Sequence, residues 1–317
     1  MSAKSAVGIV GVGAMGMAIA ERLRALRFPV AVRDIRRSRE QLAARCGAAI
    51  ARSPSDLAAS CPIVLSVVVD SHQTEDVVFG ERGLIRGMRP GAVLLLCSTV
   101  APAFAASLAR RLASHGVLMI DAPMSGGPLR ARDGTMSMML AGPEAARSKA
   151  KAVLAAMSNK RFDLGSRPGD GAAAKIVNNL LAGANLAAAA EGVALAIKLG
   201  LDPDRALDVI NASSGQSWIG EERMRRALRG DYALRASPAM LAKDLGIAIE
   251  AAADLAMPTP LAGAARSIFL SAISLGHAGS DDASVLKVYE AIGGVRPSRT
   301  PRTKSATKHL PRSSRAK

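Results

Sequence analysis

Lys175 and Asn179 are two polar residues within an apolar stretch of the sequence, GDGAAAKIVNNLL, that begins at Gly169. Residues four positions apart lie on one face of a helix, a turn from each other. An amine can act as a general base only if its pKa falls toward the working pH, which burial between two domains would cause. Lys175 could then take a hydroxyl proton while Asn179 hydrogen-bonds the same oxygen or the lysine. A lone lysine on an apolar helix more often extends its charge to solvent, but the K-x-x-N-N context at a domain junction favours catalysis.

A glycine-rich turn near the N-terminus is typical of dinucleotide binding. Its residues are Gly11, Val12, Gly13, Ala14, Met15 and Gly16, a GxGxxG pattern after an apolar run and before a helical segment. The first glycine permits the turn, the second lets a pyrophosphate approach the backbone, and the third lets helix and strand pack closely. Free N–H groups at the helix start would face the phosphates. The pattern predicts a nicotinamide cofactor at this turn.

Asp34 follows the second apolar run, about 20 residues after the glycine turn. Its carboxylate could accept hydrogen bonds from the adenosine ribose diol and would repel a 2′-phosphate, so we expect NAD. Arg33, Arg36 and Arg37 surround this position and could bind that phosphate, so NADP stays possible.

Alternating strands and helices indicate an α/β fold in the first half of the chain. We expect five buried strands, at 7–10, 30–32, 63–69, 93–96 and 117–120, each followed by a segment of helical character. This alternation predicts a parallel sheet covered by helices on both faces. Two weaker candidates, 137–140 and 161–164, could extend the sheet.

The second half of the chain is helical in pattern. The stretch 172–199 could be one long helix, apolar enough to resemble a membrane span, but its asparagines and charged residues favour a buried helix between domains. Further helices are expected at 203–210, 218–228, 238–255, 261–275 and 282–292. We therefore predict three parts: a Rossmann-type NAD(P)-binding domain at 1–166, an all-α domain for substrate binding and dimerisation at 167–296, and a basic disordered tail at 297–317.

Charge, cysteine and histidine content limit the other classes of function. Of the formal net charge of +16, eight positive charges lie in residues 296–317, which contain no Asp or Glu. We interpret this as a solvated tail, with non-specific contacts to polyanions as the alternative. Three cysteines without CxxC spacing suit reduced thiols in a cytoplasmic protein, and the four scattered histidines indicate no metal site. No signal peptide is expected, since MSAKS leads directly into the first apolar run.

Four motifs, in this order, resemble the β-hydroxyacid dehydrogenase family, which includes 3-hydroxyisobutyrate dehydrogenase. They are GVGAMGMAIAERL at Gly11, DAPMSGGPLRARDGTMSMMLAG at Asp121, GDGAAAKIVNNLL at Gly169 and KDLGIAIEAA at Lys243. The resemblance covers residues 7–292. It implies a nicotinamide-dependent oxidoreductase in which Lys175 is the general acid/base and Asn179 assists it.

The resemblance also implies contacts beyond the catalytic pair. Ser125, Gly126 and Gly127 would hold the substrate carboxylate through exposed N–H groups and the serine hydroxyl. The further cofactor contacts would be Val68, Val69, Gln73, Thr99 and Lys243. We expect Asp244 to brace Lys243 rather than to act in catalysis. Met124 stands where the family usually has Val.

The segment that runs from Ser213 to Gly246 is most similar to the branch of the family that acts on four-carbon sugar acids. L-Threonate, oxidised by NAD at its 2-hydroxyl, is therefore the expected substrate; Gln216 departs from that branch. Alternatives are oxidation of 3-hydroxyisobutyrate, NADPH-dependent reduction of glyoxylate or of tartronate or succinic semialdehyde, and a non-catalytic nucleic-acid-binding relative. Imine reductases share the fold but generally replace this lysine. From kinship we expect a homodimer or homotetramer, and no membrane association.

Overall fold

The N-terminal half is built on a six-stranded parallel sheet. The computed structural model describes residues 4–295. The strands are β1 (Val7–Val10), β2 (Val30–Arg33), β3 (Ala49–Ile50), β4 (Ile63–Ser66), β5 (Val93–Leu96) and β6 (Leu118–Asp121). Their order in the sheet is β3-β2-β1-β4-β5-β6, all parallel. The order reverses between β1 and β4, which is the position where such sheets bind dinucleotides. The predicted α/β class is confirmed.

Both faces of this sheet are covered by helices, as the continuous apolar runs of its strands require. Seven helices lie in this half: α1 (Ala14–Ala25), α2 (Arg37–Arg45), α3 (Pro54–Ser60), α4 (Ser71–Phe79), α5 (Pro102–Ala113), α6 (Gly127–Asp133) and α7 (Glu144–Met157). Side chains alternate along a strand, so in β5 Val93 and Leu95 join the core with α1 and α7. Leu94 and Leu96 join the opposite core with α3 and α5.

A second, three-stranded sheet follows the first. It consists of β7 (Met124–Ser125), β8 (Ser137–Leu140) and β9 (Lys160–Asp163), in the order β7-β8-β9. The two later strand candidates therefore form strands but do not extend the parallel sheet. They adjoin it at a bridge between Asp121 and Ala141. This second sheet holds the segment after β6 in place.

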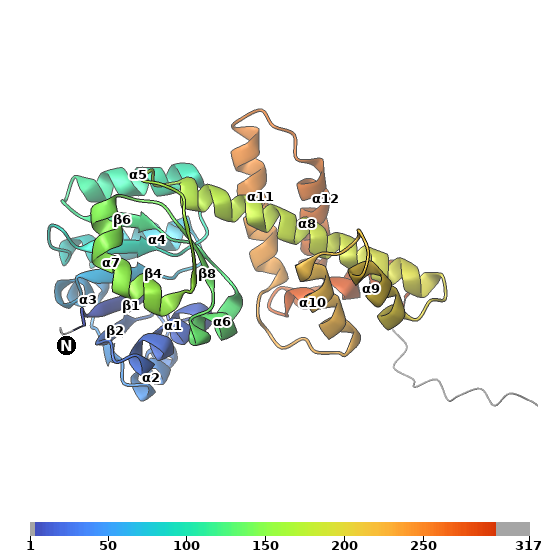
Figure 1. The fold of residues 1–317 in the computed structure, drawn as a ribbon, viewed down its shortest axis with the longest axis horizontal. Coiled ribbons are helices and arrows are strands. Elements are labelled where there is room, and N and C mark those ends of the chain that lie inside the picture. The colour runs from blue at the N-terminus through green and yellow to red at the C-terminus, as the bar shows by residue number, and fades with distance from the viewer. Residues whose placement is uncertain (1–3, 296–317) are drawn as a thin grey trace, which may run out of the picture.

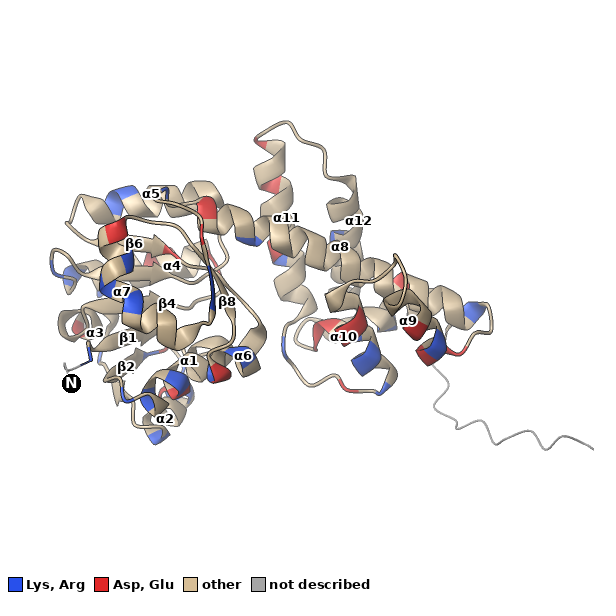
Figure 2. Cartoon of the chain, viewed as in Figure 1, with Lys and Arg blue, Asp and Glu red and all other residues tan. Residues whose placement is uncertain are grey.

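The helix α8 (Asp170–Lys198) leads from the sheet domain into a helical domain (Figure 1). Around it lie α9 (Pro203–Asn211), α10 (Trp218–Leu228), α11 (Pro238–Ala253), α12 (Pro260–Ala272) and α13 (Leu286–Gly293). Charged residues are few along α8 (Figure 2). Alanines on α8, α11 and α12 allow close helix packing, with Phe269 at the centre of this core. By length and composition α8 is also the one helix of residues 4–295 that could cross a membrane, but its buried polar residues and its neighbours are those of a domain core.

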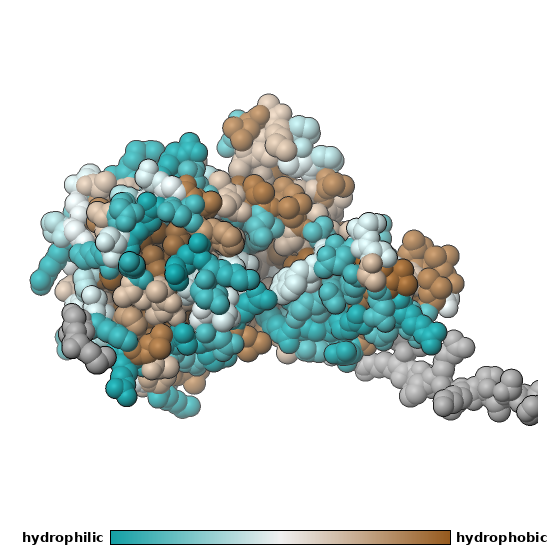
Figure 3. Space-filling model, viewed as in Figure 1, coloured by the Kyte–Doolittle hydropathy of each residue, from teal (hydrophilic) through white to brown (hydrophobic). Residues whose placement is uncertain are grey.

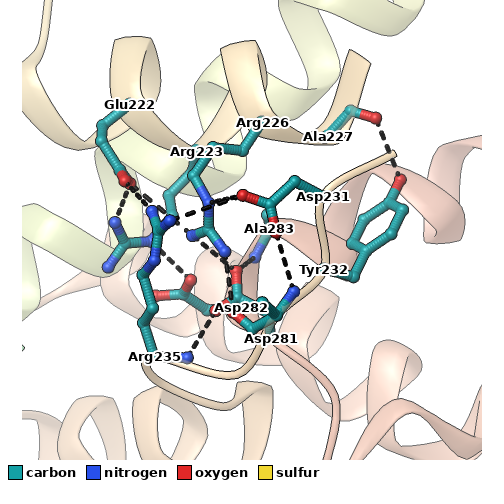
Figure 4. A network of polar contacts seen from close by, with 11 residues as sticks. Glu222, Arg223, Arg226, Ala227, Asp231, Tyr232, Arg235, Asp281, Asp282 and Ala283 are labelled. Atoms are coloured by element: carbon teal, nitrogen blue, oxygen red, sulfur yellow. Dashed lines mark hydrogen bonds and ion pairs between the residues drawn. The ribbon is translucent and has the colours of Figure 1, made fainter. Parts of the chain in front are cut away.

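A buried ion network fixes the connection between α10 and α11 (Figure 4). Arg226, almost fully buried, binds Asp231 at 3.1 Å and Asp281 at 3.0 Å. Arg223 binds Asp282 at 2.6 Å. Burial raises the pKa of Asp282 to about 6, against the opposing effect of Arg223. The network ties this connection, which precedes α11, to the segment before α13.

Two predicted helices differ from the structure at their ends. The expected helix 261–275 forms α12 as far as Ala272 and continues as a π-helical turn, Ile273–His277, in which Gly276 leaves the helical conformation with φ of 87°. The expected helix 282–292 begins as a 3-10 turn, Asp282–Val285, before α13. The predicted tail at 297–317 lies outside the described residues.

Candidate active site

The glycine turn between β1 and α1 has the geometry that a pyrophosphate needs. Gly11 has φ of 90°, a conformation that favours glycine. A Cβ on Gly16 would lie 2.0 Å from the Gly11 carbonyl oxygen, so no side chain fits there. A Cβ on Gly13 would meet nothing within 4 Å. Gly13 thus faces open space at the start of α1, where N–H groups are free to bind phosphate. These residues fit the dinucleotide.

Asp34 lies at the end of β2, directly beside this turn. Its Oδ2 accepts a hydrogen bond from the Val12 N–H at 2.7 Å, and its Oδ1 accepts one from the Arg36 N–H at 2.8 Å. Each carboxylate oxygen has a second lone pair, so the ribose hydroxyls of a nucleotide can still bind. The buried Glu40 binds the Arg33 guanidinium and accepts from the Asp34 N–H.

A surface hollow of about 580 Å³ lies next to Asp34. Its lining residues are Arg33, Ile35, Arg37, Glu40, Ile50, Ala51 and Arg52. Arg33 is held by Glu40 and by the carbonyl oxygen of Asp34. The hollow therefore has a positive rim, part of which is already neutralised by Glu40.

The other predicted cofactor residues lie at the carboxyl ends of β4 and β5. Val68 is beside the glycine turn, since its Cγ1 is 3.1 Å from where a Cβ on Gly11 would be. Gln73 accepts a hydrogen bond from the Val69 N–H at 3.1 Å. Thr99 receives a hydrogen bond from the Lys243 ammonium at 3.1 Å, through its carbonyl oxygen. The lysine on α11 thus reaches across to the sheet domain.

Lys175 is buried on the first turns of α8 and is directed at the second sheet. Its Nζ donates to the Met124 carbonyl oxygen at 2.7 Å. Burial lowers the pKa of the amine from its usual value; the carboxylate of Asp244 raises it and Lys243 lowers it further. The local fold therefore favours the neutral form of the amine, which is the form that a general base requires.

Asn179, one turn along α8, is joined to the same group of charges. Its Nδ2 donates to Asp244 Oδ2 at 2.6 Å. The other oxygen of Asp244 forms an ion pair with Lys243 at 2.7 Å. The expected bracing of Lys243 by Asp244 is confirmed, and the same carboxylate also fixes Asn179. This second contact was not predicted, because it depends on how α8 and α11 pack.

The turn after β7 brings the predicted substrate residues next to Lys175. Ser125 directly follows Met124, whose carbonyl oxygen binds the lysine. Gly126 and Gly127 both adopt positive φ, 131° and 71°, and a Cβ on Gly127 would meet nothing within 4 Å. An open backbone turn thus lies beside a buried amine, which suits a small anionic substrate.

Asp121 has a role that sequence reasoning missed. It is fully buried at the end of β6, and its Oδ2 accepts hydrogen bonds from the N–H groups of Gly169 at 3.0 Å and Ala172 at 2.8 Å. Burial raises the pKa of this carboxyl to about 6. Asp121 therefore holds the start of α8, and with it the position of Lys175. Its place at the head of the DAPMSGG motif was the available signal.

Comparisons with known proteins agree over nearly the whole chain. Residues 6–165 match the family described as the NAD binding domain of 6-phosphogluconate dehydrogenase. Residues 169–289 match the family described as NAD-binding of NADP-dependent 3-hydroxyisobutyrate dehydrogenase. The L-threonate dehydrogenase of Cupriavidus necator is 43% identical over 90% of this chain and 96% of its own length. The protein belongs to the β-hydroxyacid dehydrogenase family.

Further relatives support this membership and the fold. The L-threonate dehydrogenase of Escherichia coli strain K12 is 35% identical over 90% of this chain and 95% of its own. The crystal structure of a 3-hydroxyisobutyrate dehydrogenase from Salmonella typhimurium superposes with a TM-score of 0.82 at 35% identity, covering 90% of this chain and all of that one. As a member of the family, this protein is an oxidoreductase of hydroxy acids that uses a nicotinamide cofactor.

Proposed function

We propose that the protein oxidises L-threonate at its 2-hydroxyl group, with NAD as the hydride acceptor. The observation that carries the proposal is the position of Lys175: a buried amine of lowered pKa, bound to the carbonyl oxygen of Met124, directly before the open turn at Ser125. Relatives named for this activity, 43% identical in one case, support the choice of substrate.

In the proposed mechanism Lys175 is the general acid/base. Its neutral amine takes the proton of the substrate hydroxyl, and in the reverse direction its ammonium returns a proton to that oxygen. NAD, when bound, would accept the hydride from the carbon that carries this hydroxyl group. Asn179 uses one amide hydrogen for Asp244, so its second hydrogen is left for the substrate oxygen. Ser125, Gly126 and Gly127 bind the carboxylate.

The proposed cofactor site consists of the glycine turn, Asp34 and the residues after β4 and β5. Its members are Gly11, Val12, Gly13, Ala14, Met15, Gly16, Asp34, Val68, Val69, Gln73, Thr99 and Lys243. NAD is preferred to NADP because the Asp34 carboxylate beside the glycine turn would repel a 2′-phosphate, and Glu40 already engages Arg33. Arg37 and Arg52, on the rim of the neighbouring hollow, are the residues that would bind a 2′-phosphate.

A panel of hydroxy acids tests the proposal. L-Threonate, D-threonate, erythronate, glycerate and 3-hydroxyisobutyrate are each offered with NAD and with NADP, and the formation of reduced cofactor is followed. We expect the highest kcat/KM with L-threonate and NAD. A preference for 3-hydroxyisobutyrate, or turnover only in the reductive direction with NADPH, would replace the proposed substrate by one of the alternatives. Absence of turnover with every acid would refute the oxidation of hydroxy acids.

We further propose that the protein is a cytoplasmic homodimer or homotetramer. Exposed apolar side chains lie along α8 and at its far end, among them Val177, Leu181, Leu195 and Leu199. Apolar surface also gathers at the free end of α11 and α12 (Figure 3), where Leu255, Met257 and Leu261 are exposed. A second copy of the helical domain would cover these surfaces. Light scattering gives the mass in solution, and a monomer at micromolar concentration would refute the assembly.

The division of the chain is proposed as 1–166, 167–296 and a basic tail at 297–317. We expect the tail to make only non-specific, salt-dependent contacts with polyanions. Removing the tail should leave dehydrogenase turnover unchanged and abolish any binding to DNA. Loss of turnover on truncation would contradict this division.

A further inference from the structure

Arg130 is a cation without an acidic partner next to the substrate turn. It lies on α6, three residues after Gly127, and among residues 4–295 its side chain forms no ion pair or hydrogen bond. Arg132, two residues further along the same helix, binds Glu21 at 2.6 Å. The two arginines therefore differ in what they do with their charge: Arg132 joins α6 to α1, whereas Arg130 leaves its guanidinium free for an anion.

The stem of Arg130 runs over Gly126. A Cβ on Gly126 would lie 2.9 Å from Arg130 Cδ and 3.0 Å from Arg130 Cβ, so the missing side chain makes room for the arginine. Met124, two residues before Gly126, binds the Lys175 amine through its carbonyl oxygen. The Arg130 side chain thus packs against the turn that follows the residue bound by the catalytic amine.

The guanidinium of Arg130 contacts Trp218, which belongs to the other domain. Its Cζ is 5.3 Å from the centroid of the indole ring, within the range of a cation–π contact. Trp218 is the only tryptophan of the chain and begins α10, whose first turn is capped by the Ser217 hydroxyl. Trp218 is 56% exposed, so it is not a core residue. Figure 1 shows α6 on the side of the sheet domain that faces the helical domain.

We propose that Arg130 binds the carboxylate of the hydroxy acid and that Trp218 positions its guanidinium. A planar guanidinium matches a carboxylate in two parallel hydrogen bonds, and its weak hydration lets it stack on an indole at the same time. The backbone turn would then supply N–H donors to the anion, and Arg130 would supply the counter-charge. This inference rests on the proposed function, because it assumes that the substrate is an acid.

Steady-state kinetics of Arg130→Ala test the binding role. We expect KM for the hydroxy acid to rise about 10- to 100-fold, the effect of losing a hydrogen-bonded charge partner, with a much smaller change in kcat. The KM of Arg130→Lys should lie between those of Arg130→Ala and the wild type, because lysine keeps the charge but loses the two parallel hydrogen bonds. Arg132→Ala is the matched control, since it removes one charge from the same helix, and its KM should equal that of the wild type. Equal KM values in Arg130→Ala and Arg132→Ala would overturn the proposal.

Substitutions of Trp218 test the positioning role. Trp218→Leu should raise the KM for the hydroxy acid several-fold. Trp218→Phe should raise it much less, because a phenyl ring still accepts a cation on its face. If Trp218→Phe were as impaired as Trp218→Leu, the contact with the ring face would not be what positions the arginine.

The emission of the single tryptophan supplies a readout that does not depend on turnover. Adding hydroxy acid to the protein without NAD, so that no NADH forms, should change Trp218 emission, because the cation beside the ring becomes paired. In Arg130→Ala that change should vanish. If the wild type turns over an acid but Arg130→Ala binds it equally well, only this inference fails. If no acid is oxidised, the proposed function fails, and the emission titration alone decides whether Arg130 binds a carboxylate: no change in the wild type would overturn this inference too.

Discussion

Replacing Asp121 by Asn should make the protein less sensitive to pH. The carboxyl is fully buried, and its pKa is raised from 3.8 to about 6 by burial, against three backbone N–H groups that lower it. A raised pKa in the folded state means that folding favours the protonated form. Stability due to this group is therefore complete below pH 3.8 and is lost as the pH rises toward 6. An asparagine keeps an oxygen acceptor for the start of α8 and cannot ionise.

The size of the effect follows from the two pKa values. The interval between 3.8 and about 6 corresponds to about 3 kcal/mol over the full titration, of which about 2 kcal/mol falls between pH 4.5 and pH 7. The difference in the free energy of unfolding between Asp121→Asn and wild type should shift by that amount in favour of the variant as the pH rises. All other titrating groups are common to both proteins and cancel.

Urea unfolding at several pH values between 4.5 and 7 measures this difference. Asp121→Ala is the control: it removes the same ionisation and should show the same dependence on pH. It also loses the acceptor for Gly169 and Ala172, so it should be less stable than Asp121→Asn at every pH. If the free energy of unfolding of the wild type and of Asp121→Asn changed with pH in parallel over this range, the claim that ionisation of Asp121 destabilises the folded protein would be refuted.

Three further predictions concern the cofactor turn, the ion network and the charges beside the catalytic amine. Gly13→Ala should fold normally but bind NAD at least ten times more weakly by calorimetry, because its Cβ occupies the space that the phosphates need. Gly16→Ala should instead unfold at a lower urea concentration than the wild type, because its Cβ meets a backbone oxygen at 2.0 Å. Normal NAD binding by folded Gly13→Ala would contradict the proposed site. Arg226→Met should lower the free energy of unfolding by about 3–5 kcal/mol, because it leaves the fully buried Asp281 carboxylate without its ion-pair partner. A loss below about 1 kcal/mol would show that the network is not needed. In the direction of oxidation, kcat should rise with pH as the Lys175 amine loses its proton. At saturating NAD, Asp244→Asn should move this pH profile to lower pH, because it removes a charge that raises the pKa of Lys175. Lys243→Met should move the profile to higher pH, because it removes a charge that lowers that pKa. Shifts in the same direction would exclude electrostatic control of the amine by this pair.

The sequence predicted the sheet well where strands are buried on both faces. A short apolar run such as Val93–Leu96, placed between two helical segments, can only be interpreted as a buried strand of a parallel sheet. It missed Ala49–Ile50, an exposed strand at the edge of the sheet, because two exposed residues are too few to show a strand pattern. It extended β4 to Val69, whereas the strand ends at Ser66 and the following apolar residues turn toward Gly11. Apolar residues beside a cofactor turn look the same as strand residues in a sequence.

For the site, spacing along one helix was predictable and contacts between elements were not. The interval between Lys175 and Asn179 placed both on one face of α8, where both are buried. The binding of the lysine to the Met124 carbonyl oxygen depends on how α8 packs against the second sheet, and the contact of Asn179 with Asp244 depends on α11. No local pattern encodes the distance between such elements.

The central claim is that Lys175 is the acid/base of a NAD-dependent oxidation of a hydroxy acid. The most direct test is kcat for L-threonate oxidation by Lys175→Ala, followed as formation of NADH, in a preparation shown to fold and to bind NAD. The proposed mechanism predicts a loss of about 10²- to 10⁴-fold, the usual contribution of a general base. A variant that keeps the wild-type kcat would contradict it.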